Sequence, residues 1–196
     1  MTEKKVLFVA TVVKTHIVQF HIPYLKMLHD AGWETAVAAK NDYDDPKDCV
    51  IPYCDHYFPV SFGRSPFTRD NLRAYRELKR IINTGDFDMI HCHTPVAAFL
   101  TRLAARGARK KGCKVLYTAH GYHFYKGAPL LNWLLFFPAE WFASFFTDVL
   151  ITINREDYEF SKKHFHARRL EYVRGVGVRL ERFQNHSGER DAVRTS

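Results

Sequence analysis

The feature that most constrains the fold of this 196-residue chain is a regular alternation of short apolar segments with longer amphipathic ones. Short runs rich in β-branched residues are typical of buried strands, and apolar residues three or four positions apart are typical of helices packed on a sheet. We expect strands at 4–11, 34–40, 55–62, 87–93, 114–120, 148–153 and 170–178. We expect helices at 17–31, 71–83, 95–112, 130–146 and 154–165, with Asp70 and Asn154 as N-caps. This order predicts an α/β fold with a mostly parallel sheet flanked by helices.

The charge of the chain indicates an anionic partner. The formal net charge is +8 and the sequence pI is about 9.4, which suits a nucleic acid, an acidic membrane or a phosphorylated ligand. Part of this charge lies in the segment 95–112, whose basic residues are Arg102, Arg106, Arg109, Lys110 and Lys111. We expect a solvated helix face there, with an anionic membrane surface as the main alternative. Nucleic acid ranks third, because no recognised nucleic-acid module surrounds these residues.

The cysteines and the apolar segments argue against several classes of protein. The four cysteines match no zinc ribbon and no CxxC redox motif, so we expect free thiols in a reducing cytoplasm. The apolar run near the N-terminus is short and lacks a cleavage site, so we expect a core strand rather than a signal peptide. The longest apolar region is interrupted by Asn132, Pro138 and Glu140, so it does not resemble a membrane-spanning helix.

Polar side chains gather where the expected strands end. Because the carboxyl ends of parallel strands meet at one edge of a sheet, and ligands bind there, we expect these side chains to form the site. They are His16 after the first strand, His91 and His93 at the end of the fourth, and His120, Tyr122, His123 and Lys126 at the end of the fifth.

The histidines leave two interpretations open. His91 and His93 flank one residue of a strand, so their rings point to the same face, and with His120 or His123 they could form a metal site. Alternatively they are polar groups that hydrogen-bond to the backbone or to a ligand. We favour this second interpretation, because no carboxylate or cysteine lies at a supporting spacing. A dinucleotide fingerprint and a G-x-S-x-G elbow are both absent from the sequence.

The segment 130–146 is apolar nearly all round, whereas a helix on a sheet normally keeps one wet face. We expect its later half to be buried. For its earlier half, burial and contact with a membrane or a lipid-like acceptor both stay open. The candidate lipid-contacting residues are Leu130, Leu131, Trp133, Leu134, Phe136 and Phe137.

Four stretches of the chain resemble a known family: IHCHTPVAAFLTRLAARGARKKG, VLYTAHGYHFYKGAPLLNWLLFFPAEW, LITINREDYEF and VRGVGV. Over residues 4–183 the chain is similar to the N-terminal domain of family 4 glycosyltransferases, above all to bacterial enzymes of exopolysaccharide and capsule assembly. The resemblance implies a GT-B architecture, in which two Rossmann-like domains face a cleft. The N-terminal domain receives the acceptor, and the C-terminal domain binds the nucleotide sugar and carries an E-x7-E motif.

The resemblance also implies how the chain is organised and what it needs. Residues 1–183 would form the Rossmann-like acceptor-side domain, and 184–196 a polar linker towards a C-terminal donor-binding domain that this sequence lacks. Glu181 and Glu189 have the spacing of an E-x7-E motif, but they lie at the polar C-terminal end of the chain, which is not a credible setting for it, so we expect the fragment to be inactive alone. The donor would be a nucleotide sugar, in particular a UDP-sugar. Transfer would retain the anomeric configuration and need no cofactor and no metal.

The roles of individual residues also follow from the resemblance. His120 matches a family histidine in the cleft near the transferred sugar, where it would hydrogen-bond to that sugar and shape the transition-state site without acting as a general base. His16 falls in the family's first loop. Members often have glycine before that histidine, whereas this chain has Thr15, so a close backbone approach to a phosphate is not implied here.

The resemblance suggests an acceptor built on undecaprenyl diphosphate. Together with His16, the residues His93, Tyr122, His123 and Lys126 would bind its sugar hydroxyls and diphosphate, with Lys126 as a point charge. The apolar segment after them would meet the lipid. We therefore expect a cytoplasmic protein, peripheral on the anionic inner face of the bacterial cytoplasmic membrane, that does not bind nucleic acid.

Three other functions are alternatives to this interpretation. A non-catalytic domain that binds anionic lipid or glycan is the main alternative. A nucleic-acid-binding α/β domain would bind with a steep salt dependence. Nucleotide-sugar epimerases share the GT-B fold and remain an alternative within it.

Overall fold

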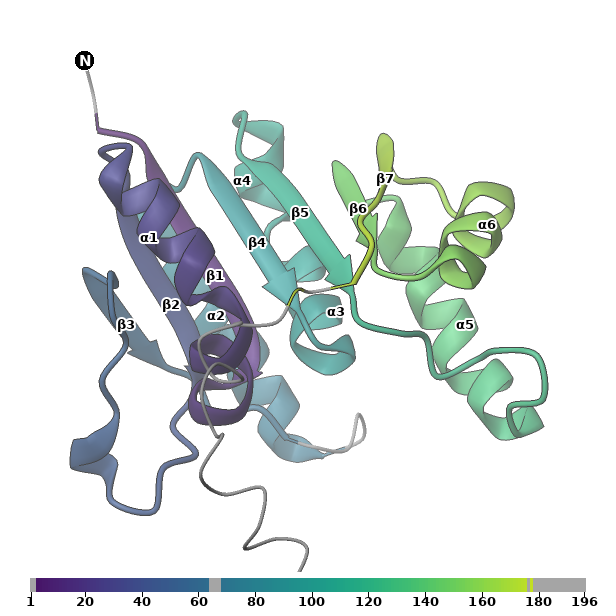
Figure 1. The fold of residues 1–196 in the computed structure, drawn as a ribbon, viewed down its shortest axis with the longest axis horizontal. Helices are drawn as coiled ribbons and strands as arrows, with labels where there is room; N and C mark the ends of the chain where they lie inside the picture. The colour runs from purple at the N-terminus through teal and green to yellow at the C-terminus, as the bar shows by residue number, and fades with distance from the viewer. Residues whose placement is uncertain (1–2, 64–67, 176, 178–196) are drawn as a thin grey trace, which may run out of the picture.

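The structure of the chain is a computed structural model that describes residues 3–63, 68–175 and 177. Within these residues, seven strands form one sheet in the order β3-β2-β1-β4-β5-β6-β7, and all six neighbouring pairs are parallel (Figure 1). The strands are β1 Lys5–Val12, β2 Glu34–Lys40, β3 His56–Pro59, β4 Met89–His93, β5 Lys114–Ala119, β6 Val149–Thr152 and β7 Arg169–Tyr172. The expected α/β fold with a Rossmann-like parallel sheet is confirmed.

Helices cover both faces of this sheet. They are the π-helix η1 Val13–His21, α1 Ile22–Asp30, the short 3-10 helix η2 Pro46–Asp48, α2 Arg69–Gly85, α3 Pro95–Ala104, α4 Arg106–Lys110, α5 Leu130–Ser144 and α6 Arg155–His164. In Figure 1, α1 lies in front of β1 and β2, α2 and α3 lie behind the sheet, and α5 and α6 lie beside β6 and β7. The described part of the chain is therefore a three-layer sandwich.

The alternation of side chains along β1 divides the core in two. Phe8 packs with Val13, Ile17 and Leu25 on the η1 and α1 side. Leu7 and its neighbours on the opposite pleat join residues of α2, α3, α5 and α6 in a second, larger cluster. A central strand of a parallel sheet is buried on both faces, which explains why this segment is a nearly continuous apolar run.

Some element boundaries differ from the sequence-based expectation. The N-cap of α2 is Thr68 rather than Asp70, which lies in the first turn, where a carboxylate suits the positive end of the helix. The basic segment is two helices that meet at Ala105, whose ψ of −3° departs from the α-helical value. Asn154 is confirmed as the cap of α6, since its side chain accepts a hydrogen bond from the N–H of Asp157.

The predicted domain boundary between residues 183 and 184 lies outside the described residues, as do Glu181 and Glu189. Among the described helices, none combines the length and the apolar character that crossing a bilayer requires.

All four cysteines are free thiols, as expected, and burial raises the pKa of the Cys92 thiol to about 12.

A buried ion pair between α3 and α5 corrects the expectation of a solvated basic helix face. Arg102 is only 1% exposed, and its guanidinium donates to the Glu140 carboxylate at 2.8 Å. The Tyr117 hydroxyl bonds to the same carboxylate at 3.3 Å, and the guanidinium lies 4.1 Å from the centroid of the Tyr117 ring. Arg109 is likewise paired, with Asp148 at 2.8 Å. The exposed cations of the segment are Arg106, Lys110 and Lys111.

The buried pair predicts an asymmetric response to mutation. Glu140→Ala leaves the Arg102 guanidinium in apolar surroundings without its partner, so we expect a loss of about 3–5 kcal/mol in the free energy of unfolding. The double variant Arg102→Met with Glu140→Leu removes both charges, and we expect it to recover most of that loss. Urea denaturation followed by circular dichroism measures both. A single variant that loses less than about 1 kcal/mol would contradict the assignment.

Candidate functional site

The candidate site lies at the carboxyl edge of the sheet, where the strand order reverses. The chain proceeds outward through β2 and β3 on one side of β1 and through β5 to β7 on the other side of β4, so the connections after β1 and β4 diverge. Such a switch point leaves a crevice. Thr94, which directly follows β4, joins the ends of β1 and β4, because its hydroxyl lies 2.7 Å from that of Thr11. Thr94 has φ of 62°, a strained conformation for a β-branched residue.

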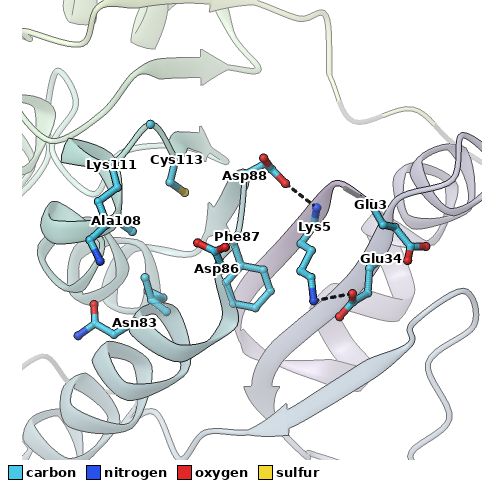
Figure 2. Close-up of a pocket in the computed structure, with 12 residues that line it drawn as sticks. Glu3, Lys5, Glu34, Asn83, Asp86, Phe87, Asp88, Ala108, Lys111 and Cys113 are labelled. Carbon is cyan, nitrogen blue, oxygen red and sulfur yellow. Dashed lines mark hydrogen bonds and ion pairs between the residues drawn. The ribbon is translucent and has the colours of Figure 1, made fainter. Parts of the chain in front are cut away.

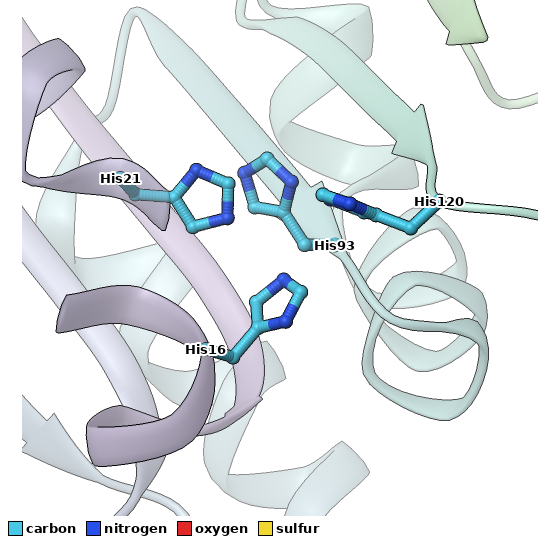
Figure 3. A group of neighbouring side chains, drawn as sticks. All are labelled: His16, His21, His93 and His120. Carbon is cyan, nitrogen blue, oxygen red and sulfur yellow. The ribbon is translucent and has the colours of Figure 1, made fainter. Parts of the chain in front are cut away.

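Four histidines meet at this crevice (Figure 3). His16 and His21 come from η1, His93 ends β4, and His120 directly follows β5. The ring centroids of His21 and His93 are 3.7 Å apart, and those of His16 and His120 are 4.9 Å apart. One ring nitrogen from each can be chosen so that all four lie within 4.8 Å of one another. We call these four residues the histidine cluster.

The histidine cluster is largely buried, and most of its ring nitrogens have no hydrogen-bond partner among the described residues. His93 is 1% exposed and His21 is 3% exposed. Both ring nitrogens of these two residues, and Nε2 of His16 and of His120, are buried and have no hydrogen-bond partner within the described part of the chain. Because buried polar atoms are nearly always paired in native proteins, six unpaired nitrogens in one place indicate a ligand-binding site.

Burial also fixes the protonation state of the cluster. Desolvation, together with the neighbouring imidazoles, lowers the pKa of His16 to about 4 and that of His21 to about 2. The pKa of His93 lies well below its ordinary value, and desolvation lowers that of His120. All four rings are therefore neutral at pH 7, and each offers one donor and one acceptor nitrogen.

The π-helix η1 explains why two histidines five positions apart reach the same crevice. In an α-helix, five residues would rotate the second side chain by about 140° from the first, because each residue turns the chain by about 100°. A π-helix has wider turns with i→i+5 hydrogen bonds, and it brings His16 and His21 together. His16 was expected in a loop, which is wrong. His21 was missed, although its five-residue spacing from His16 was visible in the sequence.

A cavity of about 130 Å³ adjoins the cluster, and His21, His93 and His120 form part of its lining. His91 also lines it, but its Nε2 lies 2.9 Å from the Thr118 hydroxyl, so it is already hydrogen-bonded. The expected shared face of His91 and His93 is confirmed, with ring centroids 4.2 Å apart.

Three other predicted site residues lie apart from the cluster, on the segment between β5 and α5. Tyr122 is buried, and its hydroxyl lies 2.8 Å from Oγ of Ser161, so its side chain packs in the core instead of facing a ligand. His123 is exposed and stacks on Phe136, with ring centroids 4.6 Å apart. Lys126 is exposed.

The helix α5 carries an exposed apolar stripe. Six large side chains on it or at its C-cap are between 41% and 73% exposed: Leu130, Leu131, Leu134, Trp141, Phe142 and Phe145. Their spacing by threes and fours places them along one side of the helix. The expected burial of the later half is wrong for Trp141, Phe142 and Phe145. Trp133, Phe136 and Phe137 are instead partly buried against the core.

An apolar groove lies beside this stripe. Its volume is about 290 Å³, and it is lined by residues of α3 and α5 that include Phe99, Leu100, Leu134 and Phe136. The groove and the stripe share Leu134. The exposed apolar surface of α5 therefore continues into a recess that could receive an alkyl chain.

The amides at the start of η1 are already occupied. The Asp42 carboxylate accepts hydrogen bonds from the N–H of Lys14 at 2.6 Å and from the N–H and hydroxyl of Thr15 at 3.2 Å and 2.8 Å. Burial acts to raise the pKa of Asp42, but these donors outweigh it and hold the pKa below its usual value. An anionic ligand would have to displace this carboxylate to reach the amides.

A larger cavity, of about 510 Å³, lies at the opposite edge of the sheet (Figure 2). Its lining includes Lys5 and Glu34, which begin β1 and β2. Here the Lys5 ammonium pairs with Glu34 at 2.7 Å, and the Lys5 N–H donates to Asp88 at 2.8 Å. Ligands of parallel sheets bind at the carboxyl edge, which is the other edge. We therefore place the functional site at the histidine cluster and not here.

Comparisons with known proteins give a family match. Residues 24–175 match the family described as Glycosyltransferase Family 4. Over 182 residues the chain is 50% identical to the protein named "Putative glycosyltransferase EpsD" of Bacillus subtilis (strain 168), a match that covers 92% of this chain and 46% of that protein. The chain thus spans about half the length of this curated relative.

Solved structures share the fold at low sequence identity. HepE of Anabaena, in a complex with UDP, matches with a TM-score of 0.64 and 14% identity over 97% of this chain and 49% of that chain. UDP-N-acetylglucosamine 2-epimerase of Rickettsia bellii matches with 0.63 and 12%, over 98% and 51%. Sucrose-phosphate synthase of Thermosynechococcus elongatus matches with 0.60 and 13%, over 98% and 53%. These likenesses concern the fold alone.

The lowered pKa values of the cluster predict a stability that depends on pH. Below about pH 6.5 the imidazoles of the unfolded chain take up protons, whereas the folded ones resist. The unfolded state then binds more protons, so stability falls as the pH drops from about 6.5 towards 4, by up to about 1.4 kcal/mol per pH unit for each such histidine.

Urea denaturation at a series of pH values measures this slope. His16→Gln removes one of the titrating groups, so we expect a shallower slope between pH 6.5 and 4 than in the wild type. At pH 8 the imidazoles are neutral in both the folded and the unfolded state. The difference in the free energy of unfolding between the two proteins at that pH therefore serves as the reference. Identical slopes would show that the folded His16 titrates like an exposed histidine.

Proposed function

Because this chain belongs to glycosyltransferase family 4, we propose that it forms the acceptor-binding domain of an enzyme that moves a sugar from a nucleotide-sugar donor to a glycan acceptor in cell-surface polysaccharide synthesis. The observation that carries the proposal is the histidine cluster. Neutral imidazoles with unpaired nitrogens, at the switch point of a parallel sheet, suit ligands rich in hydroxyl groups.

His120 is the proposed catalytic residue. It follows β5 at the carboxyl edge, lines the cavity and is only partly buried, so it can contact a sugar held there. Its neutral ring can donate a hydrogen bond to an oxygen of the transferred sugar and stabilise charge that develops in the transition state. No proton abstraction is assigned to it. The transfer is proposed to retain the anomeric configuration and to need no cofactor or metal ion.

The other proposed binding residues divide into two groups. His16 and His93, in the cluster, would hydrogen-bond to hydroxyls of the acceptor sugar. His123 and Lys126, on the exposed segment before α5, would meet the diphosphate, where the ammonium of Lys126 supplies a point charge. A donor-binding domain with a UDP-sugar is the proposed partner at the carboxyl edge, and the fragment alone is proposed to be inactive.

The lipid end of the acceptor is assigned to α5. The exposed apolar stripe offers a surface that water solvates poorly, and the adjoining groove could hold part of an alkyl chain. The exposed Arg106, Lys110 and Lys111 add the cations that attract anionic headgroups. The protein is accordingly proposed to lie peripherally on the inner face of the bacterial cytoplasmic membrane, without binding nucleic acid.

Replacing His120 by Ala in the full-length protein removes the hydrogen bond to the transferred sugar. We expect kcat/KM for transfer of a radiolabelled sugar from UDP-sugars to lipid-linked acceptor to fall by roughly 100-fold or more, as when one transition-state donor is deleted. The control is His29→Gln, an exposed histidine on α1. Activity within twofold of the wild type would remove His120 from catalysis. Acceptor binding without any transfer by the wild type would favour the non-catalytic alternative.

The α5 stripe predicts binding to lipid vesicles. Replacing Leu134 and Trp141 together by Ser removes two exposed apolar side chains, so we expect partitioning onto vesicles with anionic lipid to fall by roughly tenfold or more. Met27→Ser on α1 is the matched control, because Met27 is 59% exposed on the other side of the sheet. Cosedimentation measures both variants. Equal binding by the double variant and the control would exclude α5 as the membrane-contacting element.

A further inference from the structure

We propose that His16, His21, His93 and His120 bind one divalent transition-metal ion, and that Zn²⁺ is the ion the site fits best. The inference goes beyond the proposed function, because no step of sugar transfer needs this ion. The site also differs from the metal site that the sequence suggested, which was His91 and His93 with His120 or His123. Here His16 and His21 are ligands, and His91 and His123 are not.

The first argument is the number and position of the donors. Four ring nitrogens lie within 4.8 Å of one another, which is the ligand count of a tetrahedral site. With Zn–N bonds of 2.0–2.1 Å, tetrahedral ligand atoms are about 3.4 Å apart. The widest pair therefore has to approach by about 1.4 Å, a movement within the reach of small side-chain rotations. His21 and His93 stack at 3.7 Å, so one of these two rings also has to rotate before the in-plane lone pairs of both can point to one ion.

The second argument is the state of these nitrogens. They are buried, and they lack hydrogen-bond partners within the described residues. A bound cation would satisfy one nitrogen of each ring. It would thereby offset the free-energy cost of burying these atoms unpaired.

The third argument concerns the kind of ion. All the donors are imidazole nitrogens, which suit Zn²⁺, Cu²⁺ and Ni²⁺ and do not suit Mg²⁺ or Ca²⁺, which prefer oxygen ligands. The nearby carboxylate of Asp42 is held by Lys14 and Thr15 at the start of η1. The cavity of about 130 Å³, lined by His21, His93 and His120, provides a route for the ion.

Metal binding has a functional consequence. A ring nitrogen of His120 that coordinates the ion is withdrawn from the sugar that it is proposed to contact. Zn²⁺ would therefore inhibit transfer, in competition with the sugar ligand, and a chelator would leave transfer intact. This consequence alone rests on the proposed function, whereas the metal site itself rests on the geometry of the cluster.

The test uses the full-length protein without an affinity tag, stripped of metal by a chelator. We expect Co²⁺ to bind with a stoichiometry of one and to give the intense visible d–d bands of tetrahedral coordination, and we expect Zn²⁺ to abolish those bands. Elemental analysis after dialysis gives the zinc content independently. The proposal would be overturned if the Co²⁺-treated protein lacked the tetrahedral spectrum and the dialysed protein held less than roughly 0.1 zinc per chain.

Variants assign the site to these residues. His16→Gln and His21→Gln each remove one ligand, so we expect each to weaken Zn²⁺ affinity at least tenfold, with the fold checked by circular dichroism. His29→Gln on α1 should bind as the wild type does. Because His16 is only partly buried, its variant keeps the test decisive if His21→Gln does not fold. Unchanged affinity in His16→Gln would overturn the assignment, whatever the transfer assay shows.

Discussion

The parallel pairing of β1 with β4 is the constraint on which the rest of the structure depends. Phe8 lies opposite His91 and Val9 opposite Cys92, so both strands end at the same edge although 80 or so residues separate them. From that edge one connection turns to η1 and the other to α3. The two cannot cover the same space, and the crevice between them is where four imidazoles meet. The position of the site thus depends on the order of the strands more than on any single side chain.

The buried Arg102–Glu140 pair sets the second condition, the orientation of α5. It joins the inner face of α5 to α3, and Tyr117 ties the same carboxylate to the sheet. With its one charged residue turned inward, the most exposed side chains of α5 are all apolar. A charge in a largely apolar helix therefore decides which of its faces is exposed.

The sequence predicted the fold well, because period-two and period-3.6 patterns report directly on which face of an element is buried. It also placed His93 and His120 at the right edge, since strand ends are visible in the pattern. It failed in two situations: where the backbone departs from those periods, and where the partner of a side chain lies far away in the sequence. The π-helix concealed His21, because no standard helical spacing aligns residues five apart. Tyr122 was misassigned because its partner, Ser161, lies 39 positions away. Arg102 was misjudged for the same reason, since Glu140 is 38 positions distant.

The π-helix also has a consequence for how this chain can change over time. Within η1, the alignment of the His16 and His21 side chains depends on how many residues separate them and not on which residues those are. Substitutions at Val18 or Gln19 leave this spacing intact, and loss of one residue between the histidines would leave them four positions apart, the spacing that aligns two side chains on an ordinary α-helix. The alignment of the two imidazoles is therefore compatible with either type of helix, provided that the helix type and the spacing change together.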